Sequence, residues 1–192
     1  MTGITRDAAW DIVCKYVEGE GLKRHMLAVE AAMRYYASIF GEDLDEWGIP
    51  GLLHDFDWEI HPSIESHPAL GASILLDCGV PKDIVQTILS HAPHTGVRRE
   101  SRRDRALYAC DELTGLITAV TLVRPSKSIV DLKVKSVRKK WKDKAFASGV
   151  NRVEIENAVM DLGVELWTHV ANVIEAMCSI ASELGLEGTG QS

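Results

Sequence analysis

Apolar residues recur every three or four positions along most of the chain, which is the spacing of amphipathic helices. The segment 22–40 shows this most clearly. Its apolar positions are Leu22, Met26, Val29, Met33, Tyr36 and Phe40. No stretch of convincing length alternates apolar and polar residues as a half-buried strand would. The pattern therefore predicts an all-α protein.

Capping and breaking residues divide the chain into helical segments. Thr5 is a suitable N-cap for a first helix, and Gly19 and Gly21 end it. Pro50 interrupts the third helix, which we therefore expect to start or kink there, and Pro81 is expected in the first turn of the fifth. The other expected segments are 22–40, 43–56, 67–79, 81–92, 101–123, 128–149 and 150–184, the last as one or two helices.

The length of 192 residues suits one domain with a proper core, so we expect a single-domain helical bundle over residues 1–192. The C-terminal helices are expected within 126–184. The polar, glycine-rich end of the chain, 185–192, predicts a flexible tail.

Charge and composition narrow the classes of protein. The net charge of −7 argues against general nucleic-acid binding but does not exclude a nucleotide ligand. No run of about 18 apolar residues predicts a membrane span, and the N-terminus lacks a signal-peptide pattern. The four cysteines, expected as reduced core residues in a cytoplasmic protein, are Cys14, Cys78, Cys110 and Cys178.

Several predicted helices each carry one ionisable group at an apolar position or at an end. These groups are His25, His54, Asp55, His67, His91 and Asp111. A charged group is costly to bury unless it is paired or binds a metal, and bundles build metal sites from facing helices. Taken singly, His25 could instead be a hydrogen-bonded core residue, and Asp111 a carboxylate paired with Arg105 or with a helix N-terminus.

The order of these six residues, H…HD…H…H…D, resembles that of the HD-domain superfamily of metal-dependent phosphohydrolases, in particular the small bacterial HD hydrolases. The resemblance covers residues 22–120 and excludes the C-terminal third. The segments that carry it are "LKRHMLAVEAAM", "LLHDFDWE", "HPALGASIL", "ILSHAPHTG" and "ALYACDELTGLI". It implies an all-α, HD-type helical bundle.

The resemblance also implies a ligand set. His25, His54, Asp55 and Asp111 match the four core metal ligands, and His67 and His91 match the two further histidines of dinuclear members. Asp55 would then bridge two ions. Imidazole and carboxylate together favour one or two divalent transition-metal ions (Fe, Mn, Co, Ni or Zn), with Mg as a further candidate.

The implied activity is hydrolysis of a phosphate ester or anhydride of a small molecule, with a nucleotide as the favoured class, by metal-bound hydroxide. A mononuclear nucleoside-monophosphate phosphatase is an alternative, in which His67 and His91 would bind substrate. A non-catalytic sensor of metal or nucleotide, or a di-iron oxygenase, also stays open. No glycine-rich phosphate loop or GxSxG motif competes. Formation of a homodimer is left open.

Other polar residues are weaker candidates for the chemistry. The lysine that often follows the HD pair in the family is missing, and Asp57 and Trp58 stand there instead. Asp57 is expected either to orient a water or metal ligand or to lie on a solvated face. His94 is a catalytic candidate, expected either beside the metal ligands or in contact with substrate, or else simply exposed. His61 is expected on the surface and His169 in a structural role. Cations for phosphate are sought in Arg24, Arg98, Lys135 and Arg138, although the last two equally suit a solvated helix face.

Overall fold

The computed structural model describes residues 3–188, which contain helices and no β-strand, as the apolar pattern predicted. One isolated β-bridge joins Ser128 and Glu187. The elements, in chain order, are α1 (Arg6–Tyr16), α2 (Glu20–Phe40), α3 (Leu44–Leu53), α4 (Ala69–Asp77), α5 (Lys82–His91), the 3₁₀ turn η1 (Pro93–Thr95), α6 (Arg102–Leu122), α7 (Val134–Trp141), α8 (Arg152–Leu162) and α9 (Leu166–Cys178).

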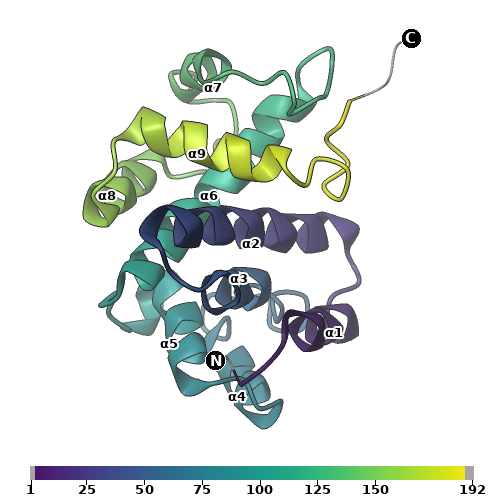
Figure 1. Ribbon diagram of the computed structural model, residues 1–192, viewed down its shortest axis with the longest axis vertical. Helices are drawn as coiled ribbons and strands as arrows, with labels where there is room; N and C mark the ends of the chain where they lie inside the picture. The colour runs from purple at the N-terminus through teal and green to yellow at the C-terminus, as the bar shows by residue number, and fades with distance from the viewer. Residues whose placement is uncertain (1–2, 189–192) are drawn as a thin grey trace.

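Helix α2 crosses the middle of the structure (Figure 1). The group α1, α3, α4 and α5 lies on one side of it, and α7, α8 and α9 lie on the other. Helix α2 packs against α3, α6 and α9, while α6 packs against α2, α5, α8 and α9. These two 21-residue helices therefore contact both groups and form the centre of the fold.

Local sequence explains where several helices begin. The Thr5 hydroxyl accepts a hydrogen bond from the Ala8 N–H, as expected for the cap of α1. The Asp43 carboxylate caps α3 in the same way. Ser101 and Asp104 form a reciprocal capping box at the start of α6. Each cap satisfies N–H groups that have no partner within the helix.

Helix α3 contradicts one of the two expectations for Pro50, that the helix starts there. The helix begins at Leu44 and continues through Pro50 instead of starting there. Proline has no N–H to offer the carbonyl four residues earlier, which belongs to Glu46. The guanidinium of Arg103 donates to that Glu46 carbonyl across 3.4 Å. A side chain from α6 thus replaces the missing donor, which explains why the helix tolerates the proline.

The C-terminal half differs from its prediction in two places. The expected helix 128–149 is reduced to α7. The segment 150–184 forms the two helices α8 and α9, which is one of the two expected outcomes. Part of the expected flexible tail is packed, since Leu186 is buried and its carbonyl accepts from the Ile129 N–H at 2.8 Å. Residues 189–192 of that tail lie outside the described residues.

The cysteines divide into two kinds. Cys110 is buried and Cys178 is half-buried, but Cys14 and Cys78 are exposed, so the core assignment was wrong for those two. Both lie in apolar segments but on faces that no other element covers. None of the described helices combines the length and apolar character needed to cross a membrane.

His169 has the structural role that the sequence suggested. The Tyr36 hydroxyl donates to its Nδ1, and its Nε2 donates to the Ala109 carbonyl at 2.9 Å. Burial lowers the pKa of His169 to about 4, so the ring is neutral at neutral pH. This buried side chain of α9 therefore ties α9 to both α2 and α6.

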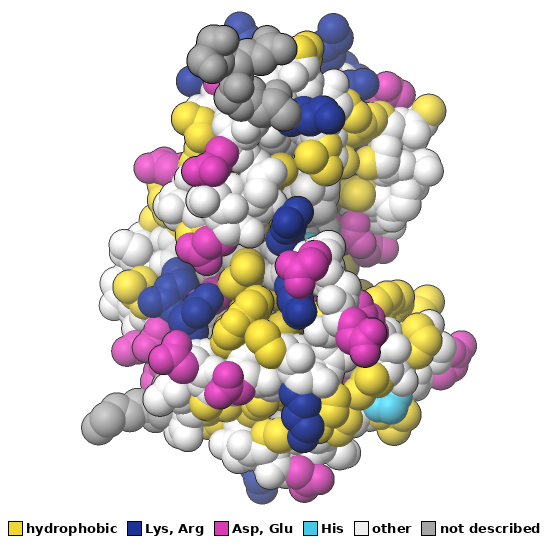
Figure 2. All heavy atoms as spheres, turned by 90° about the vertical axis from the view of Figure 1, so that its right-hand side faces the viewer, with side chains coloured by type: hydrophobic (Ala, Val, Ile, Leu, Met, Phe, Trp, Pro, Cys, Tyr) yellow, Lys and Arg dark blue, Asp and Glu magenta, His cyan; other side chains and the backbone are white. Residues whose placement is uncertain are grey.

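The surface shows no single basic field on the face drawn in Figure 2. Lysine and arginine side chains alternate there with aspartate and glutamate and with apolar side chains. This face therefore lacks the continuous positive charge that a nucleic-acid backbone would require.

Candidate metal centre

The six residues singled out in the sequence meet in one place. His25 comes from α2, His54 directly follows α3, His91 is the last residue of α5, and Asp111 lies in α6. Asp55 and His67 lie in the segment between α3 and α4, at its two ends. His25 and Asp111 are 86 residues apart in sequence, yet the His25 Nε2 lies 3.1 Å from an Asp111 carboxylate oxygen.

Asp55 lies between two groups of histidines. Its Oδ2 atom is 3.4 Å from the Nε2 of His54 and 3.7 Å from the Nε2 of His25. Its Oδ1 atom is 3.2 Å from the Nε2 of His67 and 3.6 Å from the Nε2 of His91. Each oxygen therefore faces a different pair of imidazoles.

These pairs define two groups of potential ligand atoms. In one group, formed by His25, His54 and Asp55, the ligand atoms lie within 4.8 Å of one another. The Oδ1 of Asp111 joins this group at 3.1 Å from His25 Nε2 and 3.4 Å from His54 Nε2. The other group is Asp55, His67 and His91. Two neighbouring ions could therefore share Asp55.

Two histidine rings are held through Nδ1, so that Nε2 faces the other potential ligand atoms. The Nδ1 of His54 donates to the Gly51 carbonyl at 2.8 Å, and the Nδ1 of His91 donates to the Ile88 carbonyl. Both carbonyls lie in the last turn of their helix, where no helical N–H is left to bond them. A ring that donates from Nδ1 offers the lone pair of Nε2 to a metal.

Asp57 performs the same task for His67. Its Oδ1 accepts from the Nδ1 of His67 at 2.8 Å, and its side chain is buried rather than on a solvated face. A Cβ on Gly71 would lie 2.4 Å from the Oδ2 of Asp57, so glycine is needed there to make room. Of the two roles considered for Asp57, this contact supports orientation of a metal ligand.

Buried charges shift the pKa values of the centre. Burial by itself lowers the pKa of His54, but Asp55 and Asp111 raise it well above its ordinary value. Burial raises the pKa values of Asp55 and Asp111, yet the histidines outweigh it and lower both. The carboxylates are therefore ionised and the cluster attracts cations, whether protons or metal ions.

The donor set fits a transition metal. Four imidazole nitrogens and two carboxylates converge, a mixture that suits first-row divalent ions better than the all-oxygen sites of calcium. The alternative pairing of Asp111 with Arg105 is wrong, because the Arg105 side chain faces Asp161 at 3.6 Å. His25 likewise is not an ordinary core residue, since its Nε2 lies among the other ligand atoms.

A cavity of about 400 Å³ lies over the centre. His94, a catalytic candidate from the sequence, lines it, and its Nε2 donates to the His67 carbonyl at 2.7 Å. None of the described residues that line this cavity is lysine or arginine. An anion there would therefore lie beside histidines and potential metal ligands rather than beside a lysine or arginine.

The four proposed cationic residues are spread over the molecule. Arg24 lines a neighbouring cavity that shares His25 with the first. Arg98 lines a further cavity, which shares Pro93 with the cavity over the centre. Lys135 and Arg138 contribute to none of these cavities, and Arg138 stacks on the Trp167 ring. Substrate binding by these two residues is therefore not supported by their positions.

The residues of the cavity that the sequence analysis did not assign to the site include Trp58 and Glu112. Trp58 packs edge-on against His67 with ring centroids 5.0 Å apart. Glu112 also lines the cavity, and burial raises its pKa. Neither Trp58 nor Glu112 belongs to the ordered pattern of ligands. The only sign in the sequence that they lie near the centre was that they directly follow Asp57 and Asp111.

Fold and site together define a class: an all-α protein with a buried centre of histidines and aspartates. Residues 22–116 match the family model described as HD domain. The chain belongs to the HD-domain superfamily, most of whose members are metal-dependent hydrolases. The match agrees closely with the range 22–120 expected from the motifs. Comparisons with curated proteins and with solved structures gave no match.

Proposed function

We propose that this chain is a metal-dependent phosphohydrolase that cleaves a phosphate ester or anhydride of a small molecule, with a nucleotide as the favoured class. The position of Asp55 carries the proposal, because its two oxygens face two separate pairs of histidine Nε2 atoms. Such an arrangement suits two ions that share one carboxylate. Paired ions of this kind serve in-line displacement at phosphorus.

His25, His54, Asp55 and Asp111 would hold one ion, and Asp55, His67 and His91 the other. Metal bound there would lower the pKa of a water molecule and offset phosphate charge. Other groups of the chain orient these ligands. A hydrogen-bond acceptor at each Nδ1 keeps the rings of His54, His67 and His91 in place.

The function is tested with Asp55→Ala. The wild-type chain, loaded in turn with Mn, Fe, Co, Ni or Zn, is assayed for phosphate release from a panel of nucleotides and simple phosphate esters. Asp55→Ala should abolish release and leave the helical circular dichroism signal unchanged. Asp77→Ala is the matched control, because Asp77 is an exposed aspartate at the end of α4.

Phosphate release that persists in Asp55→Ala would contradict the assignment of the site. A wild-type chain that binds metal but releases no phosphate from any member of the panel would favour a non-catalytic sensor. Oxygen consumption by the iron-loaded chain without phosphate release would favour the oxygenase.

The number of ions is tested by elemental mass spectrometry. We expect two ions per wild-type chain and one in His91→Ala, which removes a ligand of only one group. His61→Ala is the control, since His61 belongs to neither group. One ion in the wild type, unchanged in His91→Ala, would instead favour a mononuclear enzyme in which His67 and His91 contact substrate.

A further inference from the structure

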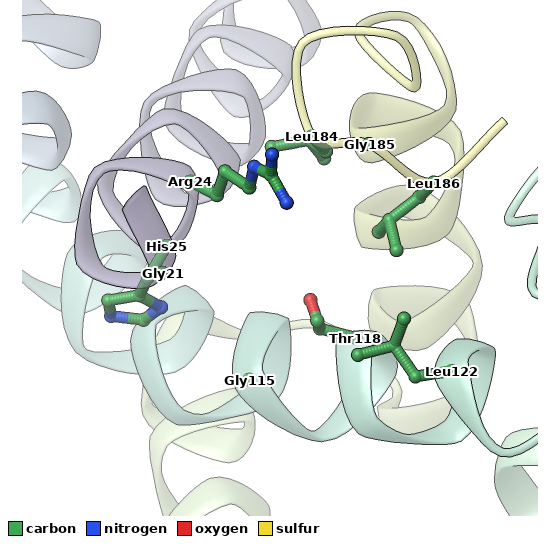
Figure 3. A pocket seen from close by; sticks show the side chains of 9 residues that line it. All are labelled: Gly21, Arg24, His25, Gly115, Thr118, Leu122, Leu184, Gly185 and Leu186. Carbon is green, nitrogen blue, oxygen red and sulfur yellow. The ribbon is translucent and has the colours of Figure 1, made fainter. Parts of the chain in front are cut away.

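A second cavity, of about 220 Å³, adjoins the metal centre (Figure 3). Its walls come from the start of α2, from α6 and from the segment that follows α9. His25 and Gly115 line both this cavity and the one over the centre. A molecule whose phosphate lies at the centre could therefore extend into the second cavity.

One cation points into this cavity. Figure 3 shows the Arg24 guanidinium directed inward from α2 and the Thr118 hydroxyl directed inward from α6. Within residues 3–188, Arg24 makes no hydrogen bond or ion pair, and the nearby Glu20 pairs with Lys23 at 3.2 Å. An unpaired guanidinium suits a carboxylate or phosphate, which it binds through two parallel hydrogen bonds.

Three leucines make part of the wall apolar. Leu184 and Leu186 are buried, whereas Leu122 is exposed. Leu184 and Leu186 belong to the packed segment after α9, so this wall is part of the folded structure. A ligand that contacts both the leucines and Arg24 would therefore combine an apolar group with an anionic group.

Two glycines keep the space open. A Cβ on Gly21 or on Gly115 would meet no atom within 4 Å, so packing does not require glycine at either position. Glycine is also the least favourable residue in a helix interior after proline. At Gly115, where the two cavities adjoin, a larger side chain would narrow the connection between them.

We propose that the second cavity binds the non-reacting part of the substrate, and that this part joins an apolar group to an anion held by Arg24. The inference rests on the proposed function and narrows the substrate class. The substrate is a phosphorylated molecule whose leaving group carries a second anionic group, either phosphate or carboxylate. The reacting phosphate lies at the metal centre, while the leucines cover the apolar group.

The test measures binding without relying on hydrolysis. Phenylphosphonate and benzoate, which cannot be hydrolysed, are titrated into the full-length chain, and leucine methyl signals are followed by NMR. We expect the methyls of Leu122, Leu184 and Leu186 to shift with at least one anion. The stronger of the two identifies the anionic group, and neutral benzamide should bind at least about tenfold more weakly.

Variants locate the site. Arg24→Gln should weaken anion binding about tenfold, and Gly115→Leu should abolish the shifts by filling the space. Lys23→Gln is the matched control and should leave binding unchanged, because Lys23 pairs with Glu20 outside this cavity. Unshifted leucine methyls, or equal binding to Arg24→Gln and wild type, would overturn the inference.

The binding experiment and the assay of phosphate release can fail independently, so failure of this inference is distinguishable from failure of the proposed function. Phosphate release with unshifted leucine methyls would overturn the subsite alone. Shifts without any phosphate release would support an anion site and refute the hydrolase.

Discussion

His67 is the most strongly constrained side chain of the centre, because a carboxylate approaches each of its two ring nitrogens. Asp57 lies at Nδ1 and Asp55 at Nε2. Burial by itself lowers the pKa of His67, but the hydrogen bonds to Asp55 and Asp57 outweigh it and raise the pKa to about 9. In the metal-free protein this ring is therefore protonated at neutral pH.

We predict that Asp57→Asn lowers the pKa of His67 from about 9 toward its ordinary value of 6.5, since one of the two carboxylates is lost. NMR titration of the His67 ring protons in the metal-free chain measures the change. Asp77→Asn, a change of an exposed aspartate, is the control. A His67 pKa that stays near 9 in Asp57→Asn would contradict the role of Asp57.

The same variant should weaken metal binding. A carboxylate behind a metal-bound histidine is typically worth about 10- to 100-fold in affinity. In the wild type, a metal has to displace the proton of His67, so affinity should rise with pH up to about pH 9. Metal titrations at several pH values measure both effects, and an affinity independent of pH would count against them.

The candidate ligands could be predicted at this scale, whereas the choice between the two roles considered for Asp57 could not. The six candidates are recognisable from their residue types and order. The contact between Asp57 and His67 depends instead on how residues 55–67 fold back toward α4, and on the absence of a side chain at Gly71. No local pattern records that geometry.

At the scale of elements, α2 and α3 approach closely at Gly51. A Cβ there would lie 3.0 Å from Met33 Cγ and 3.1 Å from the Glu30 backbone. Glycine at this position therefore lets α3 lie against the α2 backbone, and its carbonyl also holds the ring of His54.

We predict opposite effects of alanine at two helical glycines. Gly51→Ala should destabilise the fold by about 1–3 kcal/mol, because the new methyl group has no room. Gly115→Ala should stabilise it by about 0.5–1 kcal/mol, because the methyl meets no atom within 4 Å and alanine favours helix. Urea unfolding measures both changes, and equal signs would refute this account of the α2–α3 contact.

The shortened α7 shows why one helix prediction was wrong. The residues after Trp141 form turns, and their carbonyls accept hydrogen bonds from the side chain of Arg152. The carbonyls bonded by this one guanidinium are those of Trp141, Asp143, Phe146, Ala147 and Val150. In a continued helix, backbone N–H groups would donate to these carbonyls. Here the donor is the side chain of Arg152 at the start of α8, and apolar periodicity does not reveal such a contact.

At the scale of the whole molecule, His169 ties the C-terminal helices to the HD core. Its pKa is about 4 in the folded state and 6.5 when unfolded. Between these values the unfolded chain binds the extra proton, so this residue's contribution to stability is complete above pH 6.5 and is lost as the pH falls toward 4. The loss at pH 5 amounts to about 2 kcal/mol.

We predict that His169→Gln removes this dependence. The free energy of unfolding is measured by urea for both proteins at pH 7.5 and pH 5. The wild type should lose about 2 kcal/mol more than the variant between the two values. Both proteins contain the same metal-centre histidines, so the contribution of those histidines to the pH dependence of the free energy of unfolding cancels in the comparison. Equal losses would mean that the ring is not buried in its neutral form.

The expectation of one domain over residues 1–192 stays a prediction. Helices α2 and α6 contact both groups of helices, which favours a single cooperative unit. A single thermal transition monitored by circular dichroism would support it, and two separated transitions would contradict it.

The sequence by itself determined the helical class, most helix starts and the candidate ligands. These depend on local spacing, on capping side chains and on residue type, all of which can be read within a few residues. Tertiary structure alone decided that Asp55 lies between two histidine pairs, that Asp57 holds His67 and that Arg24 points into a cavity beside the centre. These features depend on distances between atoms far apart in the chain, such as His25 and Asp111, which only packing brings together.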